Sequence, residues 1–214
     1  MSARDEVLAR VRLALGDGQP QVTVPRDYRR AGEVVLPHDE LLSLLEERVV
    51  DYRAAVTRAS SATLSAVVAE RLARHRVRRL VVPPGTPGAW LGGTDLDERL
   101  TDDPPLSATE LDAVDGVVTG CAVAVAETGT LVLDAGPAQG RRILTLVPDY
   151  HLLVVRGDQV VAQVPDALAR LDARRPLTWI SGPSATSDIE LNRVEGVHGP
   201  RTLDVVLVDD GPAA

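Results

Sequence analysis

Apolar residues in the first third of the chain recur at intervals of three and four positions, and this spacing predicts helices. The first is expected near the N-terminus, where the apolar positions are Val7, Leu8, Val11, Ala14 and Leu15. The second is expected over residues 39–59, where they are Leu41, Leu42, Leu45, Val49, Tyr52 and Val56. The third is expected to begin with Ser61 as its cap and to carry Leu64, Val67, Val68 and Leu72. Residues 16–37 contain three Pro and no sustained period, so an extended connector is expected there.

Short Val-rich runs without strict alternation fill the rest of the chain, and such runs are typical of strands buried on both faces. The first is RLVVPPG, and after residue 107 come GVVTG, VAVAETGTLVL, ILTLV, HLLVV, QVVAQV, LTWIS and LDVVLV. We expect loops over residues 85–105, an antiparallel hairpin at LVVRGDQVV, and helices over residues 165–174 and 184–193. The pattern predicts an α/β sandwich with a mixed, mainly parallel sheet over residues 38–214, preceded by an N-terminal helical extension over residues 1–37.

Composition narrows the classes of function. The 214 residues contain no Lys, so the chain lacks the lysine of a Walker phosphate loop and the lysine that forms a Schiff base with pyridoxal phosphate. The formal net charge of −8 is unfavourable for nucleic-acid binding, and no apolar run approaches the roughly 20 residues that span a bilayer. Cys121 is the only cysteine, and the N-terminal segment is too charged for a signal peptide. We therefore expect a cytoplasmic protein without nucleic-acid or membrane partners.

Three stretches that follow predicted strands contain candidate site residues, because ligands of parallel sheets usually bind beyond the carboxyl ends of strands. The first is SGPSATSDIE, which follows LTWI and contains Gly182, Ser184, Thr186 and Asp188. One interpretation is an ordinary helix cap, and another is a loop whose N–H and hydroxyl donors hold a carboxylate or phosphate. A serine hydrolase is disfavoured, because the stretch lacks the last Gly of the G-x-S-x-G elbow.

The second stretch is AVAETGTLVL, in which Glu127 precedes a Thr-Gly-Thr turn between two predicted strands. A carboxylate at this place can act as a nucleophile or general base, so Glu127 is a candidate catalytic residue and Thr128, Gly129 and Thr130 are candidate ligand contacts. The alternative is a structural turn, in which Gly129 supplies the backbone conformation and the two threonines bind the backbone.

The third stretch is AGPAQGRRILTLVPDYHLLVV. Its Arg141 and Arg142 carry the planar guanidinium groups that bind carboxylates and phosphates. His151 begins a predicted strand and is a candidate catalytic residue, because an unperturbed imidazole titrates near neutral pH; the alternative is a half-buried residue that only makes structural hydrogen bonds. His198, in EGVHGPR, is a further candidate ligand contact. No C-x-x-C cluster, G-x-G-x-x-G loop or H-E-x-x-H motif occurs, so no metal or redox cofactor is expected in this chain.

Several of these strings occur together in one order: VPRDYR, VTGCAVAVAETGTLVL, AQGRRILTLVPDYHLLVV and SGPSATSDIELNRVEGVHGPRTLDVVLV. In this combination, essentially the whole chain resembles the LUD-domain family, of the lactate utilization protein C (LutC/YkgG) type. The resemblance implies a three-layer α/β fold related to NagB, RpiA and the CoA transferases. It also implies a part in oxidising L-lactate to pyruvate, together with partner subunits that carry iron–sulfur clusters. Ala185 stands where many relatives carry Arg; if that Arg contacts an anion, Ala185 either weakens the anion site here or shifts the contact to Arg193 or Arg201.

Three functions are open at this point. The leading hypothesis is a non-redox component of an L-lactate-oxidising complex that binds a small carboxylate or phosphate. The second is a stand-alone enzyme acting on a phosphorylated or acyl-activated metabolite, with Glu127 as nucleophile by analogy with CoA transferases. The third is a scaffold that only assembles the iron–sulfur partners.

Overall fold

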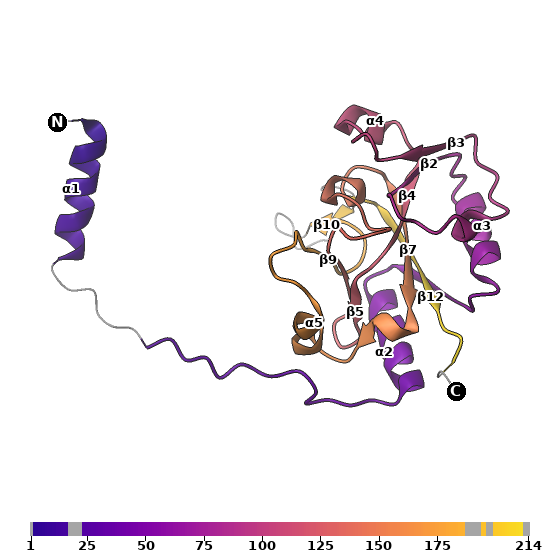
Figure 1. The fold of residues 1–214 in the computed structure, drawn as a ribbon, viewed down its shortest axis with the longest axis horizontal. Coiled ribbons are helices and arrows are strands. Elements are labelled where there is room, and N and C mark those ends of the chain that lie inside the picture. Colours follow the sequence, from indigo (N-terminus) through magenta and orange to yellow (C-terminus); the bar gives the residue numbers. More distant parts are fainter. Residues whose placement is uncertain (1, 17–22, 187–193, 196–198, 212–214) are drawn as a thin grey trace.

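The computed structural model describes residues 2–16, 23–186, 194–195 and 199–211, and Figure 1 shows its fold. Its centre is a six-stranded sheet in which every neighbouring pair of strands is parallel. The strand order is β1 (Ala55–Ala59), β12 (Thr202–Val208), β7 (Tyr150–Arg156), β4 (Gly116–Gly120), β2 (Arg79–Val82) and β3 (Glu98–Thr101). The α/β class and the mainly parallel sheet that the sequence predicts are therefore confirmed.

Helices cover both faces of this sheet. They are α2 (His38–Asp51), α3 (Leu64–Arg74) and α4 (Ala108–Asp112), whereas α5 (Val164–Arg170) packs on a second, smaller sheet. Neighbouring residues of a strand point to opposite faces, and in β7 both sets are apolar. Leu152 and Val154 pack in one core cluster with α3, whereas Leu153 and Val155 pack in another with α2. Burial on both faces explains why this strand appears in the sequence as an uninterrupted apolar run.

A second sheet of four short strands shares the core of α2. Its order is β8 (Val160–Val161), β5 (Val123–Val125), β6 (Thr130–Leu133) and β9 (Thr178–Ile180). Leu131 and Val160 join the core cluster of α2, while Val132 and Val161 pack with Ala167 of α5. The layers are thus α3, the parallel sheet, α2 with the small sheet, and α5.

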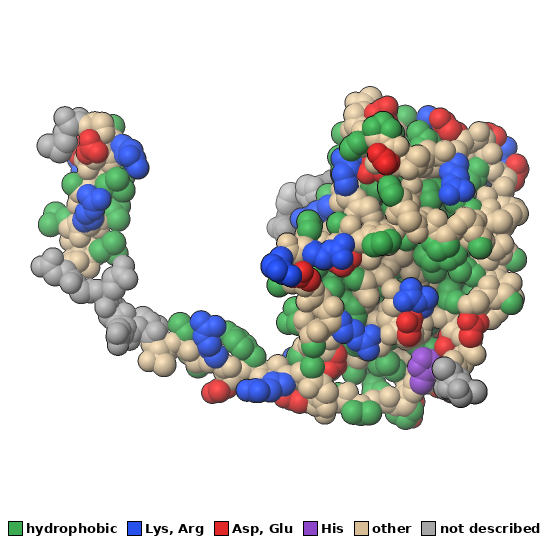
Figure 2. Space-filling model, in the orientation of Figure 1, with side chains coloured by type: hydrophobic (Ala, Val, Ile, Leu, Met, Phe, Trp, Pro, Cys, Tyr) green, Lys and Arg blue, Asp and Glu red, His purple; other side chains and the backbone are tan. Residues whose placement is uncertain are grey.

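The N-terminal helix α1 (Ala3–Leu15) starts with a reciprocal cap between Ser2 and Asp5, and none of its residues is buried. Leu13 is 85% exposed. Hydrophobic side chains are visible along α1 and the connector in Figure 2. Among the described helices, none combines the length and the apolar composition that crossing a bilayer requires. The division of the chain into residues 1–37 and 38–214 stays a prediction.

The predicted helix over residues 39–59 is too long. The helix ends at Asp51, Arg53 has a positive φ of 66°, and β1 begins at Ala55. Val56 fits the helical spacing, but it pairs with Val205 of β12 in a parallel ladder, and such a long-range contact overrides local spacing.

The third helix begins at Leu64 and not beside Ser61. The Ser61 N–H donates to Oδ1 of Asp210 at 2.7 Å, and the Ser61 hydroxyl donates to the same carboxylate. Ser61 therefore fixes the C-terminal segment to the loop after β1, and it does not cap the helix.

Two strand predictions are also wrong. LVVRGDQVV is no hairpin, because a 3₁₀ turn over Gly157–Gln159 carries the chain from β7 to β8, which lies in the other sheet and pairs parallel with β5. ILTLV lies mostly in the 3₁₀ helix η2 (Arg142–Thr145). The segment predicted to be loop-rich contains β3 and the 3₁₀ helix η1 (Gly88–Leu91).

The predicted helix start at Ser184 is wrong as well. Residues 185–186 form the short strand β10, which pairs antiparallel with β11 at residues 194–195. The chain therefore leaves β9 through a turn and enters a small ribbon, and residues 187–193 lie outside the described residues.

Candidate functional site

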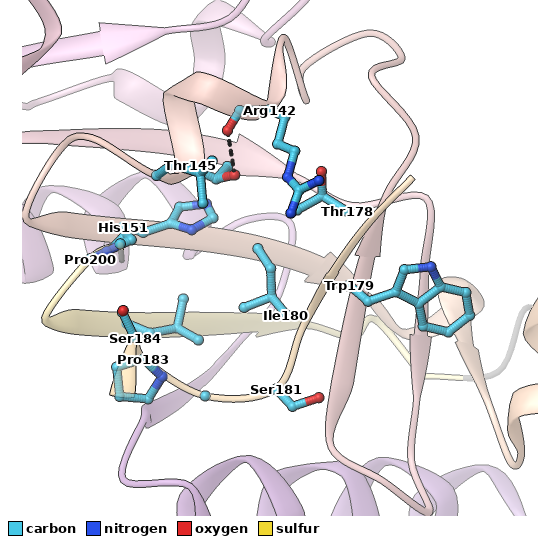
Figure 3. Close-up of a pocket in the computed structure, with 14 residues that line it drawn as sticks. Arg142, Thr145, His151, Thr178, Trp179, Ile180, Ser181, Pro183, Ser184 and Pro200 are labelled. Atoms are coloured by element: carbon cyan, nitrogen blue, oxygen red, sulfur yellow. Dashed lines mark hydrogen bonds between the residues drawn. The ribbon is translucent and has the colours of Figure 1, made fainter. Parts of the chain in front are cut away.

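A cavity of about 260 Å³, here called the His151 cavity, lies at the amino ends of β7 and β12 (Figure 3). It is bounded by η2, by β9 and the turn that follows it, and by the segment before β12. The lining residues are Arg142, Thr145, Leu146, His151, Thr178, Trp179, Ile180, Ser181, Gly182, Pro183, Ser184, Gly199, Pro200 and Leu203. The cavity follows the carboxyl end of β9, but β9 belongs to the second sheet. The cavity therefore does not lie at the carboxyl ends of the parallel strands, where the sequence led us to expect a site.

His151 lies in the floor of this cavity and is 1% exposed. Its neighbours on the adjoining strands are Val117 of β4 and Leu203 of β12. The Nε2 atom lies 2.7 Å from the hydroxyl oxygen of Thr119, which is also buried and points to the same face of the sheet. Burial lowers the pKa of His151 to about 3, so the ring is neutral at physiological pH.

Arg142 supplies the positive charge of the cavity. It begins η2, and its carbonyl oxygen accepts a hydrogen bond of 3.0 Å from the Thr145 hydroxyl. In Figure 3 the Arg142 side chain extends toward Thr178, while the Trp179 indole lies away from His151. Among the described residues, no carboxylate is paired with the Arg142 guanidinium. Its donors are therefore available to an anion in the cavity.

The turn after β9 is held in place by close contacts with two other segments. Gly182 has a positive φ of 81°, and a Cβ atom there would lie 2.5 Å from Cβ of Tyr52. The Ser184 N–H donates to the carbonyl oxygen of Pro200 at 2.8 Å. Only glycine fits this approach to Tyr52, which explains the Gly in SGPSATSDIE.

The lining combines one cation and neutral polar groups with apolar side chains such as Ile180 and Leu203. The volume lies just below the range of about 300–1,000 Å³ that is usual for small-molecule sites. These properties suit a small acid: the guanidinium can bind its carboxylate, and the apolar wall can contact a short carbon chain.

The Glu127 turn joins β5 and β6, as the sequence predicts, but Glu127 does not line the His151 cavity. Its carboxylate is exposed and accepts a hydrogen bond of 3.2 Å from the Gln163 amide. Gly129 has a φ of 59°, and a Cβ atom there would lie 2.8 Å from the backbone of Arg48. Thr130 approaches the cavity, because its hydroxyl lies 2.9 Å from that of Ser181. The structure thus connects this turn to the rim of the cavity through a threonine and not through the carboxylate.

Arg141 and Arg142, which are adjacent in the sequence, lie at different cavities. Arg141 lines a second cavity of about 540 Å³ at the carboxyl ends of β2 and β3. Its Nε and Nη2 atoms donate to the two oxygens of Asp102 at 2.7 and 2.6 Å, and Nη2 also donates to the carbonyl oxygen of Leu106. Burial alone would raise the pKa of Asp102, but the bonds from Arg141 and the Leu106 N–H outweigh it and hold the pKa below its usual value. With its charge neutralised, Arg141 is a structural residue.

The structure therefore brings Arg142, His151, Gly182 and Ser184 together. The side chain of Thr186 and all of Asp188 and His198 lie outside the described residues. Arg201, which the sequence offered as an anion contact, donates from Nε to the carboxylate of Asp149 at 3.1 Å.

Sequence reasoning missed Thr119, although a signal was present. It is a polar residue within the buried run GVVTG, and a buried hydroxyl needs a partner. Among the described residues, no group of three or more His, Cys, Asp or Glu side chains could hold a metal ion.

Comparison with known proteins gives consistent results. The model of the LUD domain matches residues 108–208. Lactate utilization protein C of Deinococcus radiodurans is 46% identical over 211 residues, which cover 96% of this chain and 95% of that protein. Lactate utilization protein C of an Exiguobacterium species is 30% identical and covers 97% of this chain and 96% of its own. The uncharacterized protein YkgG of Escherichia coli is 39% identical over 39% of each chain.

A solved structure is also similar. The crystal structure of a DUF162 family protein from Deinococcus radiodurans, at 1.70 Å resolution, superposes with a TM-score of 0.68 at 46% sequence identity. The superposition covers 81% of this chain and 99% of that one. The residues matched by the domain model include every residue that lines the His151 cavity.

Proposed function

Because this chain belongs to the LUD-domain family, we propose that it is a non-redox component of an L-lactate utilization system and that the His151 cavity binds the small carboxylate of that system. The process is taken from the names of the similar proteins, which are called lactate utilization protein C. The site is taken from the arrangement of the cavity in this chain.

The observation that carries the proposal is Arg142, a cation without an ion-pair partner among the described residues, beside the neutral and buried His151 in a small cavity. A guanidinium binds a carboxylate through two parallel hydrogen bonds. The second cavity is less suited to an anion, because Asp102 neutralises the charge of Arg141 there. Free lactate and pyruvate are short acids of a size that fits the His151 cavity, and inorganic phosphate is the competing anion to test.

The chemistry of the chain supports a non-redox role. Oxidation of lactate to pyruvate removes two electrons and two protons, and iron–sulfur clusters that receive electrons are held by several cysteine thiolates. This chain has only Cys121, and burial raises the pKa of that thiol to about 12. The proposal therefore includes partner subunits that carry the iron–sulfur clusters and accept the electrons.

Calorimetric titration of the purified full chain with L-lactate, pyruvate and inorganic phosphate tests the binding. We expect lactate or pyruvate to bind, and Arg142→Ala to weaken the binding roughly tenfold to a hundredfold, because a hydrogen bond to a charged group is lost. Arg99→Ala is the matched control, since Arg99 is exposed on β3 and has no ion pair with a described residue. If neither acid binds, or if both variants behave like the wild type, the site is wrong.

A genetic test addresses the role in the cell. We expect that deletion of the gene abolishes growth on L-lactate as sole carbon source, and that the wild-type chain restores growth while Arg142→Ala does so poorly. The protein purified from lactate-grown cells should carry iron–sulfur proteins with it. The Glu127→Gln variant tests the alternative that the protein is an independent enzyme. That alternative holds if the purified wild-type chain alone turns over an acyl or phosphoryl substrate and this variant does not.

A further inference from the structure

We infer that Thr119 is a positioning residue that holds His151 in the tautomer with its proton on Nδ1, so that His151 gives the ligand a hydrogen-bond donor. The cavity would then select small acids with an acceptor oxygen on the carbon next to the carboxylate. Such acids are 2-oxo and 2-hydroxy acids, as opposed to 2-amino acids. This inference rests on the proposed function and specifies the ligand class of the same site.

The first observation is that Thr119 and His151 form an isolated buried pair. Thr119 lies on β4 and His151 on the adjacent β7, their side chains are on the same face of the sheet, and they are 0% and 1% exposed. The distance of 2.7 Å between Oγ1 and Nε2 is that of a hydrogen bond. Among the described residues, the Thr119 hydroxyl has no other partner.

The second step follows from counting donors and acceptors. A threonine hydroxyl has one proton to donate, and a neutral imidazole has one protonated nitrogen and one acceptor nitrogen. If the hydroxyl donates to Nε2, its proton is satisfied and the imidazole proton lies on Nδ1. If Nε2–H donates instead, the hydroxyl proton is left buried without an acceptor, which costs about 1–3 kcal/mol. The first arrangement is therefore favoured.

The third observation concerns the other ring nitrogen. Nδ1 has no hydrogen bond to a described residue. Among the described residues, the side-chain N and O atoms that are both fully enclosed and without a hydrogen bond are limited to Nε2 of His75. Nδ1 of His151 also lacks a hydrogen bond but is not among them, so it is not fully enclosed by protein. Because His151 lines the cavity, we infer that Nδ1 faces it. We therefore place a buried donor in the wall of the cavity that Arg142 also lines.

This arrangement determines what the ligand must present. With the carboxylate on Arg142, a keto or hydroxyl oxygen on the next carbon can accept a hydrogen bond from Nδ1–H. An ammonium group at that carbon has only donors and would leave both groups unpaired, so it should be rejected. The same tautomer prevents His151 from taking the proton of a hydroxy acid, because its acceptor nitrogen is occupied by Thr119. His151 then binds the ligand and does not act as the general base.

The tautomer is measured directly by long-range ¹H–¹⁵N NMR of the ¹⁵N-labelled full chain. Loss of one signal in His151→Asn assigns His151 among the four histidines. We expect a protonated Nδ1 in the wild type and in Thr119→Ser, which keeps the hydroxyl, and a mixture or the opposite tautomer in Thr119→Val. A protonated Nε2 in the wild type would overturn the inference. This outcome is measured on the wild type alone, so it does not depend on whether a variant folds.

Calorimetry completes the test with pyruvate, L-lactate, L-alanine and propionate. We expect wild type and Thr119→Ser to bind pyruvate and lactate, and to bind alanine and propionate at least roughly tenfold more weakly, which corresponds to one hydrogen bond. Thr119→Val should lose most of this preference. Equal binding of alanine and pyruvate, or an unchanged preference in a folded Thr119→Val, contradicts the inference. If no acid binds while Nδ1 is protonated, the proposed function fails and the role of Thr119 in fixing the tautomer stands.

Discussion

The hydroxyl oxygens of Thr130 and Ser181 lie 2.9 Å apart, although the two residues are separated by 51 positions in the sequence. The Thr130 hydroxyl also lies 2.8 Å from that of Thr128. A chain of three hydroxyl groups therefore runs from the turn after Glu127 to the rim of the His151 cavity. Two stretches that the sequence presents as separate candidate sites are parts of one framework.

Breaking this chain should loosen the rim. Thr130 is nearly buried, so Thr130→Val is expected to lower the free energy of unfolding by about 1 kcal/mol, because it leaves the hydroxyl of Ser181 with one partner fewer. Thr130→Ser keeps the hydroxyl and should behave like the wild type. Urea unfolding of the three proteins measures the difference, and calorimetry should show weaker lactate or pyruvate binding only in the valine variant. Equal stability of the valine and serine variants would contradict this role of the hydroxyl.

The adjacent arginines should respond in opposite ways. Arg141→Ala removes the partner of the buried Asp102 and should lower the free energy of unfolding by about 2 kcal/mol, the value of hydrogen bonds to a charged group. Arg142→Ala should change stability by no more than about 0.5 kcal/mol, as is usual for an exposed side chain that has no ion-pair partner in the described part of the chain, but it should weaken ligand binding. Unfolding curves and calorimetry on both variants make the comparison, and the opposite pattern would move the anion site to the larger cavity.

These arginines also show what the sequence could predict of the site. The residue types of the site could be predicted, because Arg, His and Gly occur at the ends of predicted strands. The sequence could not predict that Arg141 pairs with Asp102 while Arg142 lines the cavity, because Asp102 lies 39 positions from Arg141. Thr119 was missed for a similar reason: its importance depends on His151, 32 positions away on the neighbouring strand.

The fold shows the same limit. Strands buried on both faces, such as β7 and β12, were predictable because their sequences contain the apolar runs LLVV and VVLV. ILTLV was mistaken for a strand, because a short apolar run has no period that distinguishes a strand from a helical turn. The predicted hairpin at LVVRGDQVV failed because β8 pairs with β5 of the second sheet, and no local pattern carries that information.

Two glycines offer a matched test of the approach to Tyr52. Gly182 and Gly93 have similar φ values of 81° and 78°, but a Cβ at Gly182 would lie 2.5 Å from Cβ of Tyr52, whereas a Cβ at Gly93 would have nothing within 4 Å. Gly93→Ala should cost only the backbone strain of a left-handed residue, about 1–2 kcal/mol. Gly182→Ala should cost a further 1–3 kcal/mol or so, which is the usual effect of overpacking, and should distort the cavity. Thermal or urea unfolding measures both, and equal losses would show that the turn moves freely away from Tyr52.

The buried imidazole should make stability depend on pH. The pKa of His151 is lowered by burial from its ordinary value of about 6.5 to about 3, so between these values the unfolded chain binds a proton that the folded chain does not. The contribution is constant above about pH 6.5, and stability falls as the pH drops from there toward 3, by up to about 1.4 kcal/mol per pH unit. His151→Gln has no titrating ring, and its amide oxygen can still accept from Thr119. Urea unfolding at several pH values between 7 and 4, followed by the fluorescence of Trp90 and Trp179, should give a steeper loss for the wild type than for the variant. Parallel curves would mean that folding does not lower the pKa of His151, and burial would then not be what keeps this imidazole neutral.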